Sequence, residues 1–376
     1  MWVLCMDIVC GERLNEFVSI IKVIRRFSMR YWVGETPNNS IKLKHNYVMD
    51  SVINYYHMED PKIEYDYNKL FLDNGAFSSL KNSQKSVLRE ERVLNIQEKL
   101  KPEYTVPLDY PFTPGMDRVV MKKRWEKTAE NIEYWIDVTD LNLVPALHAW
   151  DRSSLNDNIK LLYRKDQDYI AMGSILTTAD EFNGFFGDRQ PSKNLIDSII
   201  TTKQICDQYD LDIHIFGFGS SPIMYHIGAF IGIKSTDSIG YKRKAAYGKI
   251  ILPQTGERYC GSGKAKFGNT NQGNSASCCL TKDELQKLAQ CKCPACKDQP
   301  ADGSIRWENL KSDWVKRAYH NKWVMEHEEE VSRIYNDDKE AYSKFLDETI
   351  GRSGLGHLWE YTKRRLTYYK TDLSQW

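Results

Sequence analysis

Short apolar runs alternate with longer amphipathic stretches through the first two thirds of this 376-residue chain. Eight runs rich in β-branched and aliphatic residues predict strands, near 2–8, 31–33, 69–73, 103–108, 142–148, 168–174, 212–217 and 232–236. Helical patterns occupy 13–29, 43–58, 85–100, 118–138, 153–164, 193–209 and 222–230. Strands that alternate with helices predict βα units and a parallel sheet. Eight such units favour an α/β fold of the (β/α)8 TIM-barrel class. The alternative is an open doubly wound sheet, although no Gly-x-Gly-x-x-Gly opens the first unit.

Composition limits the environment and the partners. Hydrophobic residues make up 41% of the chain, enough for a sizeable core, and a net charge of +1 gives no global attraction for nucleic acid. No apolar run is long enough to span a membrane. The segment 1–10 contains Asp7 and no basic leader, so we interpret it as a strand rather than a signal peptide. Sparse cysteines favour a reducing, cytoplasmic compartment.

Polar residues and glycines follow the predicted strands. Asp73, Asp109 and Asp237 come at or just after three of them, and His148 ends a fourth. Two others end in glycine-containing stretches, at 173–174 and 217–219. In a barrel these strand ends share one face, where the active sites of such folds lie. The sequence therefore predicts one pocket formed by six separate segments.

Three carboxylates at one pocket could act on a glycosidic bond. One can attack the anomeric carbon as a nucleophile while a second moves the proton. A third can accept paired hydrogen bonds from an amidine-like edge, such as N1–H and N2–H2 of guanine. The alternative for any single one, Asp73 above all, is a helix N-cap.

Aromatic side chains lie near these carboxylates in the sequence. Phe77 follows Asp73, and Phe216 precedes Gly217. Such rings can stack on an extruded base. Further candidates are Tyr110, Phe112 and Phe218. A place in the core is the alternative for most of these rings, and particularly for Phe216.

Basic residues gather after Asp237. We expect contacts to a phosphate backbone from Lys242, Arg243, Lys244, Lys264 and Lys266. A solvated loop is the alternative.

Three cysteines lie within six residues near the C-terminal third. Cys291, Cys293 and Cys296, with His320 downstream, fit a tetrahedral structural zinc site. Other residues that could replace His320 are His327, Cys278 and Cys279. Without a metal, the cluster would be a set of reactive thiols or a disulfide.

We expect three parts: a catalytic barrel at 1–240, a basic loop and zinc-binding subdomain at 241–330, and C-terminal helices at 331–376 that pack on the barrel. The helical patterns after 280 cover 281–290, 308–334, 338–350 and 355–370.

Together these motifs resemble the tRNA-guanine transglycosylase family, which has a (β/α)8 barrel with a zinc-binding insert. Segment 73–78 is similar to its Asp-Ser-Gly-Gly-(Phe/Tyr)-Gln, and 108–114 to its Asp-Glu-Cys-Thr-Pro loop. Segment 171–175 is similar to Ala-Val-Gly-Gly-Leu, 214–219 to a strand ending Met-Gly-Val-Gly, and 232–238 to Gly-x-Asp-x-Phe-Asp-Cys. The Cys-x-Cys-x-x-Cys with a following histidine matches the family's zinc site.

The resemblance implies a role for each matching residue. Asp237 would be the nucleophile and Asp73 the acid/base. The implied base-binding residues are Asp109, Phe77, His148, Gly173, Ser174, Phe216 and Gly217. Zinc would be structural, held by the cysteine cluster and His320.

The departures from the family concern the nucleic acid that the enzyme would modify. The family's Arg-x-x-Arg-Asn-Gly segment, which handles tRNA, is not recognisable in 241–248, and Ala76 and Ser78 replace a glycine and a glutamine. This resembles the branch that inserts 7-deazaguanines into DNA, found in phages and bacterial DNA-modification clusters. We therefore expect a DNA-guanine transglycosylase that exchanges guanine for free 7-cyano-7-deazaguanine, acting in the cytoplasm, or in the host cytoplasm if phage-encoded. Its expected partners are DNA and the free base, with a homodimer or accessory modification proteins left open. The alternatives are a tRNA-guanine transglycosylase, a base-releasing N-glycosylase and a non-catalytic subunit of a transglycosylase complex.

Overall fold

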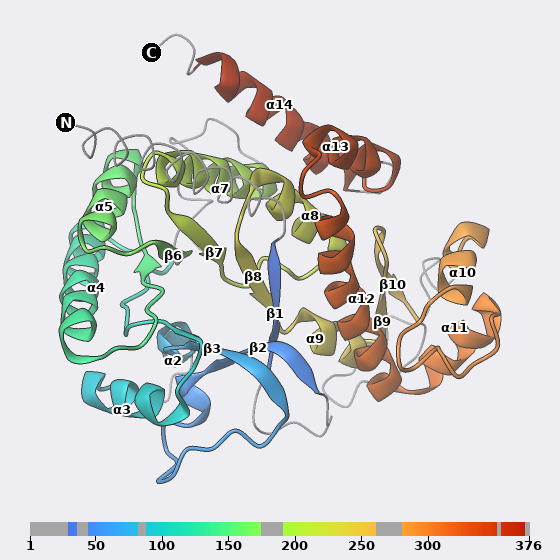
Figure 1. The fold of residues 1–376 in the computed structure, drawn as a ribbon, viewed down its shortest axis with the longest axis horizontal. Helices are drawn as coiled ribbons and strands as arrows, with labels where there is room; N and C mark the ends of the chain where they lie inside the picture. The colour runs from blue at the N-terminus through green and yellow to red at the C-terminus, as the bar shows by residue number, and fades with distance from the viewer. Residues whose placement is uncertain are drawn as a thin grey trace, which may run out of the picture.

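Eight parallel strands form one curled sheet in this computed structural model, which describes residues 29–35, 44–81, 88–173, 191–260, 280–351 and 355–372 (Figure 1). The strands are β1 Arg30–Gly34, β2 His45–Ser51, β3 Tyr67–Asp73, β4 Tyr104–Thr105, β5 Ala146–Leu147, β6 Tyr169–Met172, β7 Asp212–Ile215 and β8 Ser235–Ser238. Their order is β4-β3-β2-β1-β8-β7-β6-β5. At the outer edges, a parallel bridge links Thr105 at β4 to Leu143 ahead of β5, with Thr105 N–H donating to Asn142 O over 2.9 Å.

Helices follow most strands and lie around the outside of the sheet (Figure 1). They are α2 Ala76–Lys81, α3 Glu90–Leu100, α4 Arg118–Val138, α5 Arg152–Arg164, α7 Pro191–Asp207, α8 Pro222–Ile231 and α9 Gly240–Ala246. Local sequence sets their ends. Asp151 and Ser154 form a capping box at the start of α5, and Ser221 caps α8, which ends at Gly232 with a left-handed φ of 96°. The alternation of strands and helices is confirmed within the described residues.

The two faces of the sheet pack against different partners. Alternate residues such as Tyr31 and Val33 pack outward against the helices. The residues between them point inward, where Trp32 lies 5.4 Å from Phe71 between ring centroids. Tyr104 and Tyr169 continue this inner layer, 5.3 Å apart. Among the described residues, the inside of the curl is therefore a packed core.

The predicted helix at 43–58 is wrong. This segment forms β2 and a short 3-10 helix, η1 Val52–Asn54. β2 pairs in parallel with both β1 and β3. Two adjacent residues within β2 are buried on opposite faces of the sheet, Val48 in the outer layer and Met49 in the inner layer. Adjacent residues face opposite sides in a strand. Here pairing with a strand on each side overrides the local helical propensity of the segment. The other predicted runs correspond to β1 and to β3 through β8, while 2–8 and nearly all of 13–29 lie outside the described residues.

The C-terminal part begins with a hairpin, β9 Lys249–Leu252 and β10 Gly256–Tyr259. Within the described part of this region, five helices follow: α10 Lys282–Ala289, α11 Gly303–Ser312, α12 Trp314–Ile334, α13 Lys339–Glu348 and α14 Gly356–Asp372. The prediction of a single helix at 308–334 is wrong. The helix is interrupted at Asp313, whose side chain caps the start of α12. α12 crosses the expected domain boundary at 330 and contacts α8, α9 and β9, while α13 packs on α8 and α14 on α7. None of the described helices is both long and apolar enough to cross a membrane.

Candidate active site and metal centre

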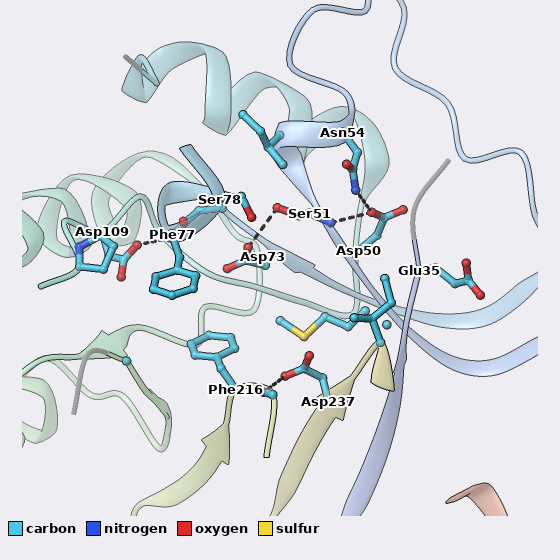
Figure 2. A pocket seen from close by; sticks show the side chains of 18 of the residues that line it. Glu35, Asp50, Ser51, Asn54, Asp73, Phe77, Ser78, Asp109, Phe216 and Asp237 are labelled. Atoms are coloured by element: carbon cyan, nitrogen blue, oxygen red, sulfur yellow. Dashed lines mark hydrogen bonds between the residues drawn. The ribbon is translucent and has the colours of Figure 1, made fainter. Parts of the chain in front are cut away.

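A pocket of about 410 Å³ opens at the carboxyl ends of the strands (Figure 2). It brings together most of the residues predicted to form the site. These are Asp73, Phe77, Asp109, His148, Gly173, Phe216, Gly217 and Asp237. Ser174, also predicted, lies outside the described residues.

Strand alternation explains why these side chains converge. Asp73 lies two residues after Phe71 on β3, and Phe71 belongs to the inner layer. In the same way Phe216 comes two residues after the inward His214, whose ring contacts Phe71 at 4.7 Å between centroids. Because side chains alternate along a strand, Asp73 and Phe216 each continue an inward column past the end of the packed core.

Asp73 lies in an environment that favours its protonated form. Burial and the neighbouring charges of Asp109 and Asp237 raise the pKa of Asp73 to about 7. Opposing this, the Ser51 hydroxyl and the Gly75 N–H each donate to Oδ2 of Asp73 over 3.0 Å. A carboxyl group with this pKa can give and take a proton near neutral pH.

Asp237 has a different environment. The backbone N–H of Gly217 donates to its Oδ1 over 2.7 Å, and Nε2 of His214 lies 3.4 Å from the same atom. Gly217 has a φ of +66°, a conformation that glycine adopts without strain. No hydrogen bond from a described residue reaches Oδ2 of Asp237 (Figure 2). This oxygen is therefore available to the pocket.

Asp109 is held from two sides. The Asn74 side-chain amide donates to its Oδ1 over 2.9 Å, and Nε2 of His148 lies 2.7 Å from its Oδ2. His148 was expected to contact a base, but its Nε2 is engaged with Asp109. Its ring also packs so closely on Gly173 that a Cβ there would come within 2.5 Å of Cε1. Glycine at 173 is thus required by the position of the imidazole.

Two of the predicted aromatic rings line the pocket. Phe77 is 38% exposed and Phe216 is half-buried, and both rings are turned into the cavity from opposite sides (Figure 2). Phe216 also packs against the inner core layer, so it combines the predicted pocket position with the alternative of a core position. Phe112 and Phe218 are buried in the outer core, and Tyr110 donates its hydroxyl to Glu90.

Sequence reasoning missed an acidic and polar wall contributed by β1 and β2. Asp50 accepts hydrogen bonds from Tyr55, Tyr65 and Asn54, each at 2.6 Å. Burial raises its pKa. Glu35 also lines the pocket. Since 43–58 was interpreted as a helix, its polar residues could not be assigned to a strand end.

The basic residues after Asp237 are partly used inside the protein. Lys242 pairs with buried Glu35. Burial alone would raise the pKa of Glu35, but its bonds to His45, Lys242 and Tyr241 hold it below its usual value. Lys244 pairs with Glu257 over 3.1 Å, whereas Arg243 is exposed. Lys264 and Lys266 lie outside the described residues.

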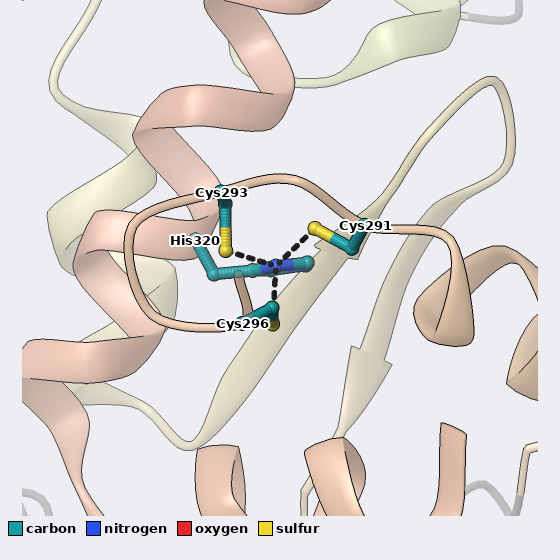
Figure 3. Close-up of side chains that lie close together, drawn as sticks. All are labelled: Cys291, Cys293, Cys296 and His320. Carbon is teal, nitrogen blue, oxygen red and sulfur yellow. Dashed lines mark hydrogen bonds between the residues drawn. The ribbon is translucent and has the colours of Figure 1, made fainter. Parts of the chain in front are cut away.

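A second cluster lies between the hairpin and α12. The ligand atoms of Cys291, Cys293, Cys296 and His320 all lie within 4.8 Å of one another, and all four residues are buried (Figure 3). Nδ1 of His320 faces the thiols at 3.4–3.9 Å, while its Nε2 lies 2.9 Å from the carbonyl oxygen of Ile251. Bonding of the second ring nitrogen to a carbonyl fixes a histidine for ligation.

These four residues could hold a metal ion. Three soft thiols and one imidazole converge without a disulfide among them, which fits the tetrahedral donor set of zinc. Of the alternative ligands, His327 stacks on Trp323 at the surface and pairs with Glu330 over 2.9 Å. Cys278 and Cys279 lie outside the described residues.

Comparison with known proteins adds no relative: no family model and no curated protein matches this chain.

Proposed function

We propose that this protein is a DNA-guanine transglycosylase, built on a (β/α)8 barrel that closes through the bridge between Thr105 and Leu143. It exchanges guanine in DNA for a free 7-deazaguanine, with 7-cyano-7-deazaguanine as the expected base. The observation that carries the proposal is the contrast between two carboxylates in one pocket. Asp73 has a raised pKa, while Asp237 is anchored through one oxygen and presents the other. Pairs of titratable groups in opposed environments are typical of acid and nucleophile roles.

The reaction uses these groups in two balanced steps. Oδ2 of Asp237 forms a bond to C1′ of the nucleotide as the bond from C1′ to N9 breaks, and Asp73 gives its proton to the departing guanine. The incoming base then loses its N9 proton to Asp73 and forms a new bond to C1′. The bond to Asp237 breaks and its carboxylate is restored. One glycosidic bond replaces another, so no redox or nucleotide cofactor takes part.

The base-binding part of the proposal rests on Asp109 and two rings. A carboxylate has about four acceptor sites, so Asp109 can accept from a purine edge as well as from Asn74 and His148. Phe77 and Phe216 would cover the two faces of the purine. His148 acts here through Asp109, holding the carboxylate against the pocket wall.

The C-terminal cluster is proposed to hold structural zinc. Its three thiolates and Nδ1 of His320 would complete a closed tetrahedral shell, which leaves no open position for chemistry. Zinc would tie the turn at 291–296 to α12, and α12 in turn packs on α9, the helix that follows Asp237.

The choice of DNA rests on the sequence, where the family's tRNA-handling segment is replaced. With Lys242 and Lys244 engaged in ion pairs, Arg243 is the described residue of this basic group best placed for a phosphate.

Incorporation of labelled guanine tests the activity without assuming which deazaguanine is used. Incubated with DNA, the protein should transfer labelled guanine into the polymer without creating abasic sites. Label in tRNA alone would support the tRNA enzyme, abasic sites would support the N-glycosylase, and no transfer to either polymer would contradict base exchange.

A further inference from the structure

His214 is a buried histidine with one ring nitrogen aimed at the proposed nucleophile. Its Nε2 lies 3.4 Å from Oδ1 of Asp237 and makes no hydrogen bond to any residue that the structure describes. The imidazole is fully buried, with ring contacts to Phe71 at 4.7 Å and to Phe216 at 4.9 Å between centroids. An unpartnered buried polar atom is costly, and here it faces a carboxylate that a small movement would bring into hydrogen-bond range.

Two hydroxyl groups beside Nδ1 of His214 can place the proton of the ring on Nε2. Nδ1 of His214 lies 2.6 Å from Oγ of Ser235, which also contacts the hydroxyl of Tyr169. Burial raises the pKa of Tyr169 far above its ordinary value, so its hydroxyl stays protonated. Tyr169 can then donate to Ser235 and Ser235 to Nδ1. This order leaves the proton of the neutral ring on Nε2, facing Asp237, whereas the opposite tautomer would turn a lone pair toward the carboxylate.

We propose that His214 is a positioning residue for Asp237. Its Nε2–H acts with the Gly217 N–H to hold Oδ1, which leaves Oδ2 to attack C1′. The reaction step of this inference rests on the proposed transglycosylase function, while the contact between His214 and Asp237 does not.

The two donors should matter most when the intermediate breaks down. As the incoming base forms its bond to C1′ and the bond to Oδ2 breaks, the electron pair returns to the Asp237 carboxylate. Negative charge then develops on both of its oxygens. Donors already placed at Oδ1 stabilise that charge without rearrangement.

Two substitutions separate this role from simple packing. In His214→Gln the amide nitrogen can reach the place of Nε2 and still donate to Asp237. In His214→Asn the shorter side chain reaches only the place of Nδ1, near Ser235. Circular dichroism and zinc content should establish that both variants are folded.

We expect His214→Asn to lower kcat for exchange by about tenfold to a hundredfold, somewhat less than the loss of a full oxyanion donor. KM for the free base should not change, and the fraction of enzyme trapped as a covalent DNA adduct by a denaturing quench should rise. His214→Gln should restore kcat to within about threefold of wild type. Equal losses in both variants, or an adduct fraction that falls in step with kcat, would overturn the proposal.

Nitrogen NMR of histidine-labelled protein tests the contact without relying on activity. We expect the His214 signals, assigned by their loss in His214→Gln, to show a protonated Nε2 and to shift in Asp237→Asn. A ring protonated only on Nδ1, or signals insensitive to Asp237→Asn, would refute the positioning role. Wild-type protein that neither exchanges base nor traps an adduct would overturn the proposed function, and the NMR result would still decide the contact.

Discussion

The hydroxyl of Ser51, at the end of β2, donates a hydrogen bond over 3.0 Å to Oδ2 of Asp73, at the end of the neighbouring β3. The two residues are register partners in the parallel sheet, so pairing of the backbones places the hydroxyl beside the carboxyl group. Ser51 orients the proposed acid/base, and burial keeps that group able to hold a proton near neutral pH.

Substitution of the proposed nucleophile should abolish exchange. Asp237→Asn keeps an oxygen that can accept from the Gly217 N–H, so the fold should persist, but an amide cannot attack C1′. We expect kcat to fall by at least about a thousandfold, with no covalent adduct on denaturing gels. Exchange at the normal rate would exclude Asp237 as the nucleophile.

Asp73→Asn should inactivate the enzyme but stabilise it at alkaline pH. The folded-state pKa of Asp73 is raised to about 7, so the native state holds a proton that the unfolded chain releases near pH 4. Its contribution to stability is therefore favourable at low pH and is lost as pH rises through that window. The neutral amide should raise the free energy of unfolding by at least about 1 kcal/mol at pH 8 and change it little below pH 4.

Urea denaturation of wild type and Asp73→Asn at the two pH values measures this difference. An equal difference in stability at both pH values would show that the Asp73 pKa is not raised in the folded protein.

Recognition of the base should depend on the acceptors of Asp109. Asp109→Asn is nearly isosteric and can still accept from Asn74, but it replaces one acceptor by a donor facing the purine edge or His148. We expect affinity for the free base, measured by calorimetry, to fall about tenfold to a hundredfold, the scale of hydrogen bonds to a charged group. Unchanged affinity would remove Asp109 from base recognition.

Stacking by Phe77 can be tested in the same assay. Phe77→Ala should weaken binding of the free base by about 1–3 kcal/mol, since base–aromatic stacking is worth this much. Phe77 is 38% exposed, so its loss should cost little stability. Tyr163→Ala is a matched control, because Tyr163 is exposed but does not line the pocket. Equal effects of both substitutions would contradict a stacking role.

Removal of the metal should destabilise the protein rather than alter its chemistry. We expect one zinc per chain, and loss of zinc with a lower Tm in Cys293→Ala. Cys260→Ala is the control, because Cys260 is buried in the same hydrophobic cluster but is not one of the four converging residues. Elemental analysis that finds a full complement of zinc in Cys293→Ala would exclude this ligand set.

Periodicity and motif order predicted most of the fold. The two elements that were predicted wrongly differ from the structure for physical reasons. β2 was not predicted because its pairing on both sides overrides a helical pattern. The positions of Asp50 and Ser51 in the pocket were therefore not predicted either. The break between α11 and α12 was signalled by Asp313, a good N-cap residue inside an otherwise helical pattern.

The sequence predicted that Asp73 and Asp237 lie in the pocket, because each carboxylate comes at or just after the end of a predicted strand. Roles that depend on long-range partners were not predictable. The pairing of Lys242 with Glu35 joins residues 207 positions apart, and nothing near Lys242 in the sequence indicates it. The sequence predicted His148 in the site, but its contact with Asp109 could be found only from the three-dimensional structure.

Nucleoside mass spectrometry distinguishes base exchange in DNA from base exchange in tRNA. The protein is incubated with free 7-cyano-7-deazaguanine and, in parallel, with DNA or with bulk tRNA, and each polymer is digested to nucleosides. We expect a 7-cyano-7-deazaguanine deoxynucleoside in the DNA digest of the wild-type reaction, and none in the reaction with Asp237→Asn. A modified ribonucleoside in the tRNA digest alone, or no modified nucleoside in either digest, would contradict base exchange in DNA.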